Sequence, residues 1–172
     1  MVVCSNSGHV PTKKMRGEVS TYLVVNASAK DVWAVFRSPD LPRIVPNLIP
    51  GVFKEIKILK GDGGVGSVLR NVLAKGIPGP RSWEEKIVMI DNVKRMKRIR
   101  MTKGGFLDLG FRSYENFFKI IEKGTKSCMI KSAVIFKADE DKFESNAFRI
   151  RVDATWGFSK AIAFYVVQKN KK

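Results

Sequence analysis

Two strand-like runs are joined by a glycine-rich segment, Gly61–Ser67, which reads GDGGVGS. Glycine loops that bind dinucleotides or phosphates instead open a helix, because the helix N-terminus receives the phosphate groups. A P-loop also ends in Gly-Lys-Ser or Gly-Lys-Thr, and this segment has no such ending. The segment is therefore predicted to turn one strand into the next, and a nucleotide-binding loop is excluded at this position.

The remaining pattern predicts one α+β domain with a curved antiparallel sheet. A first strand is expected over 18–26, a helix capped by Ser28 over 29–36, and a second short helix over 41–48. Residues 52–137 are typical of six further strands joined by short turns, which makes seven strands in all. A closing helix is expected over about 153–168, with an apolar face made of Ala154, Phe158, Ile162 and Tyr165 and widened by Trp156, Ala161 and Phe164.

At 172 residues, the chain is long enough for one sizeable core. We expect residues 1–16 to be a flexible tail and residues 17–172 to form a single ligand-binding or catalytic domain. The tail has no apolar run suited to a signal peptide or a membrane span, so a cytoplasmic location is expected. Cys4 and Cys128 make neither a disulfide framework nor a metal set, so no metal or cofactor is expected.

The formal net charge of +16 raises the question of a nucleic-acid partner. The basic residues are spread along the chain, however, and no aromatic and glycine signature of RNA-binding modules lies among them. A solvated basic surface is the favoured interpretation, with no membrane and no nucleic acid as partner and with the oligomeric state left open. In the densest basic run, Lys94–Arg100, neighbouring residues should face opposite sides of a strand, so part of the run must face inward.

A curved sheet around one long helix can leave a pocket between the two layers. Aromatic and apolar side chains are candidates for its lining, although such residues are more often plain core than ligand contacts. The candidates are Trp83, Leu69, Phe106, Phe111, Phe117, Trp156, Phe158 and Phe164.

Several motifs resemble those of the plant pathogenesis-related class 10 and major birch-pollen allergen family. The segments Gly61–Gly66, Ile90–Asn92, Gly104–Gly110 and Ser127–Ser132 are similar to the norcoclaurine synthases of this family, and Gly76–Gly79 is similar to norbelladine synthase. The resemblance runs from about residue 16 to residue 137. It implies a helix-grip fold, and it implies that dopamine condenses with an aromatic aldehyde through loss of water, without a cofactor.

The resemblance also carries four site positions onto this chain. The lysine and glutamate of the norcoclaurine pattern fall on Lys97 and Glu85, while the tyrosine and aspartate positions hold Trp83 and Asn116. Lys97 and Glu85 are therefore expected to be catalytic, and Trp83, Asn116, Leu69 and Phe106 to bind substrate. Independently, a lysine can protonate a leaving hydroxyl group and a carboxylate can accept a proton, whereas tryptophan and asparagine do not titrate.

Other interpretations of these residues remain open. Lys97 and Glu85 could form an ordinary surface ion pair, which contributes little to stability. The two altered positions make a non-catalytic carrier of a small hydrophobic metabolite or hormone a credible alternative. A ribonuclease is disfavoured because the only histidine, His9, lies in the expected tail and leaves no histidine acid–base pair.

Overall fold

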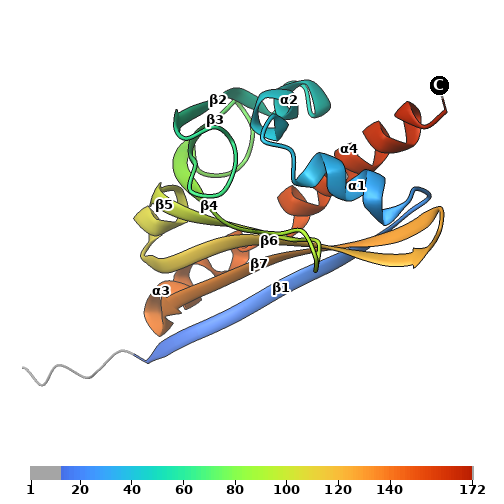
Figure 1. The fold of residues 1–172 in the computed structure, drawn as a ribbon. Helices are drawn as coiled ribbons and strands as arrows, with labels where there is room; N and C mark the ends of the chain where they lie inside the picture. Colours follow the sequence, from blue (N-terminus) through green and yellow to red (C-terminus); the bar gives the residue numbers. More distant parts are fainter. Residues whose placement is uncertain (1–12, 172) are drawn as a thin grey trace, which may run out of the picture.

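A computed structural model describes residues 13–171 (Figure 1). Most of the expected tail lies outside these residues, but Lys14–Arg16 already belong to the first strand. Seven strands form one antiparallel sheet in the order β1-β7-β6-β5-β4-β3-β2. They are β1 (Lys14–Val25), β2 (Phe53–Lys60), β3 (Val68–Leu73), β4 (Ser82–Asp91), β5 (Met96–Gly104), β6 (Phe111–Gly124) and β7 (Ser127–Asp139). The predicted seven-stranded sheet is confirmed.

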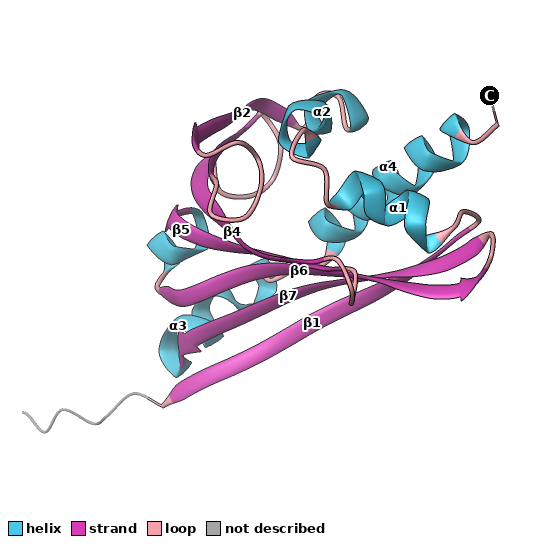
Figure 2. Ribbon diagram, viewed as in Figure 1, coloured by secondary structure: helices cyan, strands magenta, loops and turns pink. Residues whose placement is uncertain are grey.

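The helix after β1 and the long C-terminal helix lie on the same side of the sheet (Figure 2). The short helices α1 (Ala29–Phe36) and α2 (Leu41–Leu48) follow β1, and the long helix α4 (Asp153–Lys169) closes the chain, as expected. Ser28 caps α1, because its Oγ accepts a hydrogen bond from the backbone N–H of Asp31 at 3.1 Å. Three further short helices lie between the larger elements: η1 (Gly105–Leu109), α3 (Glu140–Asn146) and η2 (Ala147–Arg149).

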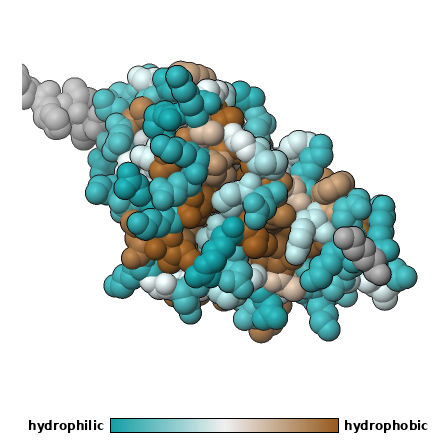
Figure 3. Space-filling model, turned by 90° about the horizontal axis from the view of Figure 1, so that it is seen from above, coloured by the Kyte–Doolittle hydropathy of each residue, from teal (hydrophilic) through white to brown (hydrophobic). Residues whose placement is uncertain are grey.

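The inner face of the sheet, meaning the face that α1 and α4 contact, carries the core. Near α1 and α4, the rings of Phe36, Phe118 and Phe158 pack together with centroids 5.3–6.0 Å apart. A second cluster fills the other end of the sheet and contains Met101, Phe111, Tyr114, Val134, Phe136 and Ala138. Seen from above, apolar side chains remain visible between polar ones on the helical side (Figure 3). The two clusters flank the part of the inner face where the polar residues described below lie.

Helix α4 packs through a different face from the one expected. Its buried residues are Thr155, Ser159, Ile162, Ala163 and Val166. The side chains of Phe164 and Trp156 are exposed by 66% and 37%, so the prediction that they line the interior is wrong. Small residues allow α4 to lie close to the sheet, where the hydroxyl groups of Ser132 and Ser159 form a buried hydrogen bond of 2.7 Å. Only Phe158 of the three aromatic candidates on α4 contacts the core.

The glycine-rich segment joins β2 to β3, as predicted, and it packs tightly against the rest of the fold. The Gly63 N–H donates to Ser67 Oγ at 2.9 Å, and the Ser67 carbonyl oxygen accepts a hydrogen bond of 3.0 Å from the backbone N–H of Ile87. Gly63 has a φ of 102°, and a Cβ at this position would lie only 1.9 Å from the carbonyl oxygen of Pro39. Glycine is therefore required here by both backbone conformation and space.

Gly17 gives a test of the packing between β1 and β7. It lies opposite Phe136, and a Cβ on Gly17 would approach the Phe136 ring to 2.3 Å. Phe136 is buried and stacked on Phe143, so the ring cannot move aside freely. We expect Gly17→Ala to lower the free energy of unfolding by about 1–3 kcal/mol, measured by urea denaturation.

Gly157 provides the matched control. It lies within α4, and a Cβ there meets nothing within 4 Å. Gly157→Ala should raise the free energy of unfolding by up to about 1 kcal/mol, because alanine is the better helix former. Equal effects of the two substitutions would show that the contact between Gly17 and Phe136 does not limit the packing.

Candidate functional site

Lys97 lies on the inner face of β5 and is buried, with 1% of its surface exposed. Its Nζ donates a hydrogen bond of 2.9 Å to the backbone carbonyl oxygen of Phe36. Its neighbour Arg98 lies on the opposite face, where its guanidinium pairs with Glu115 at 3.4 Å. This alternation agrees with the prediction that Lys97 faces inward, and a surface position for Lys97 is excluded.

The bond to Phe36 places a cation at the end of a helix. Phe36 is the last residue of α1, where carbonyl groups lack partners within the helix and carry partial negative charge. No basic residue lies in the last turn of α1 itself. Lys97 therefore supplies from β5 the positive charge that a lysine or arginine of the helix would otherwise provide. The strand and the helix are thus tied together through this side chain.

Burial also changes the acidity of Lys97. Desolvation lowers the pKa of its ammonium group from 10.5 to about 8, and the nearby negative charge of Glu85 opposes this change. A lysine with a pKa near 8 can exchange a proton close to neutral pH, which an ordinary surface lysine does far less readily. Lys97 is therefore suited to acid–base chemistry.

Glu85 lies on β4 beside Trp83, two residues away on the same face. The indole N–H of Trp83 donates to Glu85 Oε2 at 2.9 Å. Burial raises the pKa of the Glu85 carboxyl group, and the hydrogen bond from Trp83, the side chain of Asn71 and the charge of Lys97 oppose that rise. Trp83 thus orients the carboxylate and leaves Oε1 free of this bond. The described contacts include no direct ion pair between Glu85 and Lys97.

Asn71 joins this group, and the sequence interpretation did not single it out. It lies on β3 directly opposite Trp83 and is 2% exposed. Its Nδ2 is buried near the Glu85 carboxylate, whose pKa it lowers, but it makes no hydrogen bond of good geometry with any residue that the structure describes. A buried donor without a well-formed hydrogen bond costs free energy, so this amide group is suited to bind a ligand oxygen. Its alternation with Leu69 and Leu73, which are both buried, is the signal that could have identified it.

The other predicted binding residues have different surroundings. Asn116 lies on β6 opposite Ile99, and the alternation with Tyr114 and Phe118 places it on the inner face. Leu69 is buried directly opposite Glu85. Phe106, in η1, stacks on Tyr114 with ring centroids 4.2 Å apart, so it packs against the second cluster. The structure therefore brings Leu69, Glu85 and Trp83 together on neighbouring strands.

Phe111 and Phe117 were the remaining candidates for the lining of a pocket. Phe111 is buried and belongs to the second core cluster. Phe117 faces the opposite side of the sheet, where Arg98 and Lys131 lie over its ring at 5.7 and 5.9 Å from the centroid. The prediction that Phe117 lines the interior is therefore wrong, because the residues on either side of it occupy the inner positions.

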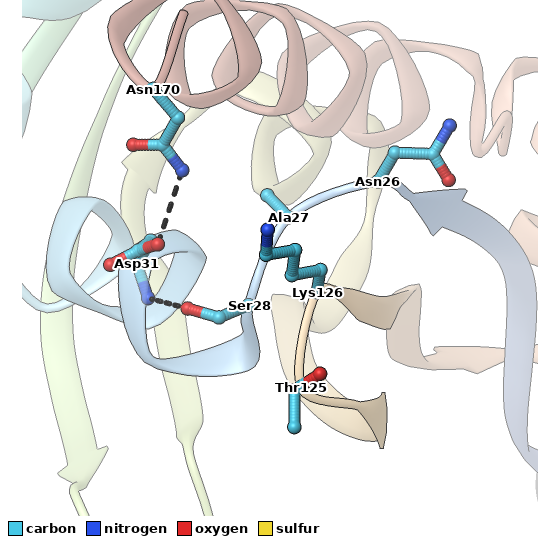
Figure 4. A pocket seen from close by; sticks show the side chains of 7 residues that line it. All are labelled: Asn26, Ala27, Ser28, Asp31, Thr125, Lys126 and Asn170. Atoms are coloured by element: carbon cyan, nitrogen blue, oxygen red, sulfur yellow. Dashed lines mark hydrogen bonds between the residues drawn. The ribbon is translucent and has the colours of Figure 1, made fainter.

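A pocket of about 340 Å³ lies away from these residues, between the start of α1, the β6–β7 turn and the end of α4 (Figure 4). The Nδ2 of Asn170 donates to Asp31 Oδ2 at 3.1 Å, and Ser28 caps α1. These polar groups hold the ends of two helices together. This pocket is separate from the one predicted between the inner face of the sheet and α4, which stays a prediction.

Two other kinds of site are absent between residues 13 and 171. No group of three or more His, Cys, Asp or Glu side chains lies where it could hold a metal ion. Within the same range, none of the helices is both long enough and apolar enough to cross a membrane. Cys128 is a buried free cysteine, and burial raises the pKa of its thiol to about 11, so a reactive thiolate is disfavoured there.

The lowered pKa of Lys97 predicts a dependence of stability on pH. Between about pH 8 and 10.5 the lysine is protonated in the unfolded chain but neutral in the folded one, so the free energy of unfolding rises with pH. Over the full interval the rise is about 3 kcal/mol. We expect Lys97→Met to lose this rise, measured by urea denaturation of both proteins between pH 7 and 10. Parallel curves for the two proteins would contradict the pKa assignment.

The chain is similar to known proteins in both sequence and structure. The chain is 36% identical to S-norcoclaurine synthase 2 of Papaver somniferum over 90% of its own length and 67% of that relative. It is 37% identical to norbelladine synthase of Narcissus pseudonarcissus, with 90% and 94% covered. A solved structure of Thalictrum flavum norcoclaurine synthase in complex with dopamine and hydroxybenzaldehyde has a TM-score of 0.86 at 32% identity, covering 90% of this chain and 88% of that one.

A family model spans almost the whole described chain. The model of the pathogenesis-related protein Bet v 1 family matches residues 14–157, which include all seven strands and the start of α4. A further structure, a point mutant of the Thalictrum flavum enzyme with a transition state analogue, has a TM-score of 0.88 and covers 92% of this chain and 98% of that one. With the fold and the extent of the match in agreement, the chain belongs to the pathogenesis-related protein Bet v 1 family.

Proposed function

We propose that the protein condenses dopamine with an aromatic aldehyde in plant alkaloid biosynthesis, with Lys97 and Glu85 as its catalytic residues. The observation that carries this proposal is the buried Lys97, whose pKa is lowered to about 8, on the same inner face as Glu85. The relatives named norcoclaurine synthase and norbelladine synthase support a reaction of this kind.

The proposed chemistry assigns one proton transfer to each residue. The amine of dopamine adds to the aldehyde carbonyl and gives a carbinolamine. The Lys97 ammonium group then protonates the carbinolamine hydroxyl, which leaves as water while the nitrogen lone pair forms the iminium double bond. Glu85, whose raised pKa makes it a better base than a surface carboxylate, accepts a proton from a catechol hydroxyl group or later from the ring carbon. Holding both reactants together supplies the remaining acceleration.

The extent of the reaction depends on the two altered positions. Trp83 donates to Glu85 but cannot exchange a proton, and Asn116 carries no charge where the norcoclaurine pattern has an aspartate. Ring closure needs a base for the ring proton, and Glu85 is left to provide it. The proposal therefore covers both a Pictet–Spengler ring closure and a condensation that stops at the imine.

A non-catalytic carrier of a small hydrophobic metabolite is the second candidate function. The observation that favours it is the engagement of Lys97 Nζ by the Phe36 carbonyl group, which gives this lysine a structural role without any ligand. A carrier would bind the aromatic ligand tightly and would return it unchanged.

The central experiment incubates the protein with dopamine and either 4-hydroxyphenylacetaldehyde or 3,4-dihydroxybenzaldehyde, and separates the products by chiral chromatography. We expect Lys97→Met and Glu85→Gln each to lower kcat by about 10²–10⁴-fold, the usual contribution of general acid–base catalysis. Lys86→Met is the control, since Lys86 is exposed on the other face of β4. Racemic product at the uncatalysed rate, together with tight binding, would favour the carrier.

The pH profile tests the roles of the neighbouring side chains. We expect kcat/KM to fall above about pH 8 as Lys97 loses its proton, and this alkaline limb should disappear in Lys97→Met. The acidic limb reports Glu85. Trp83→Phe and Asn71→Leu should both move it to higher pH, and Trp83→Phe should move it further because Trp83 lowers the pKa of Glu85 more strongly.

An unchanged acidic limb in both variants would remove Glu85 from the reaction. Dopamine binding, followed by tryptophan fluorescence over the same pH range, separates an effect on affinity from an effect on turnover. If Asn71 donates to a ligand oxygen, Asn71→Leu should also weaken dopamine binding by about ten-fold, the effect of losing one hydrogen bond.

A further inference from the structure

The outer face of the sheet, meaning the face opposite to the helices, carries an unusual arrangement of positive charge. Three pairs of basic residues lie directly opposite each other on neighbouring strands. The pairs are Lys57 and Arg70 on β2 and β3, Lys86 and Arg100 on β4 and β5, and Lys119 and Lys131 on β6 and β7. Each member of the last two pairs lies between inward-facing neighbours such as Phe118 and Ile120, which places its side chain outward.

Like charges that face each other across strands destabilise a sheet. Two of the six residues have an acidic partner, because Arg100 pairs with Glu115 at 2.6 Å and Lys131 pairs with Glu18 at 2.7 Å. Within residues 13–171, the other four form no ion pair; they are Lys57, Arg70, Lys86 and Lys119. The repulsion is therefore only partly relieved inside the protein, and an anionic partner would relieve the rest.

The edge of this face indicates which anionic partner fits. Tyr22 lies opposite Lys131, and Val24 follows it on the same side of β1, with 54% and 67% of their surfaces exposed. An exposed tyrosine and an aliphatic side chain beside lysines suit the boundary between lipid headgroups and acyl chains. At the centre of the face, the ring of Phe117 is covered by Arg98 and Lys131, so it is not open for stacking on nucleic-acid bases.

We infer that the outer face of the sheet docks on an anionic lipid surface. The contact is electrostatic and needs no membrane-spanning segment. It departs from the expectation, drawn from the sequence, that no membrane takes part, because the pairing of the cations across strands becomes visible only in the register of the sheet. The inference is independent of the proposed function, since Lys97 and Glu85 lie on the opposite face.

The test compares two triple variants of equal net charge by cosedimentation with vesicles. The face variant is Arg70→Gln, Lys86→Gln and Lys119→Gln. The matched control, Lys30→Gln, Lys160→Gln and Lys169→Gln, removes three exposed cations from α1 and α4. With vesicles of phosphatidylserine and phosphatidylcholine at low salt, we expect the face variant to bind about 100-fold more weakly than wild type and the control to change less than about three-fold.

Five outcomes decide the inference. Binding should be lost with pure phosphatidylcholine and should weaken steeply as salt is raised. The melting temperature of the face variant should be no lower than that of wild type, because the substitutions remove like-charge pairs. Equal weakening in both triple variants would overturn the inference, since net charge alone would then explain binding. Retention of single-stranded RNA by wild type but not by the face variant, without vesicle binding, would also overturn it.

Discussion

The hydrogen bond between Lys97 Nζ and the Phe36 carbonyl group connects the structural and the chemical roles of this fold. It ties β5 to the end of α1 at 2.9 Å, and it does so with a charged group that is almost wholly removed from water. A buried ammonium group is tolerated only when it finds acceptors, and the free carbonyl end of a helix is one. Helix α1 must therefore end above β5. With α1 in this position Lys97 is also removed from water, and this desolvation lowers its pKa.

The negative charge near Lys97 is the carboxylate of Glu85, which has a hydrogen-bond partner of its own. Glu85 does not pair directly with the lysine but receives the indole N–H of Trp83 at 2.9 Å. The two ionisable groups keep distinct environments, and their pKa values move toward each other, with the lysine lowered and the glutamate raised. Such convergence is typical of acid–base pairs, because it moves the pKa of each group closer to the pH at which the group must exchange a proton. A surface ion pair would show the reverse pattern.

The sequence predicted those parts of the fold that depend on local patterns. Strand alternation predicted that neighbours in the basic run face opposite sides of the sheet, and the family resemblance selected Lys97 as an inward residue. The glycine pattern was enough to exclude a nucleotide loop. The contacting face of α4 could not be predicted in this way. Its large aromatic residues Trp156 and Phe164 are exposed, while Ser159 is buried because its hydroxyl group forms a hydrogen bond with Ser132. That partner lies 27 residues away in the chain, and no local pattern reveals it.

The choice between catalyst and carrier depends on how Lys97 uses its donors. A lysine ammonium group has three N–H donors, and the Phe36 carbonyl group occupies one of them. The bond to α1 therefore fixes the direction of the side chain without using up its capacity to donate. A ligand oxygen near Glu85 would need only one of the two remaining donors, and the structural bond would persist throughout a turnover. Because the anchoring of the helix and the proton transfer do not compete for the same donor, the structural role of Lys97 is no argument against catalysis.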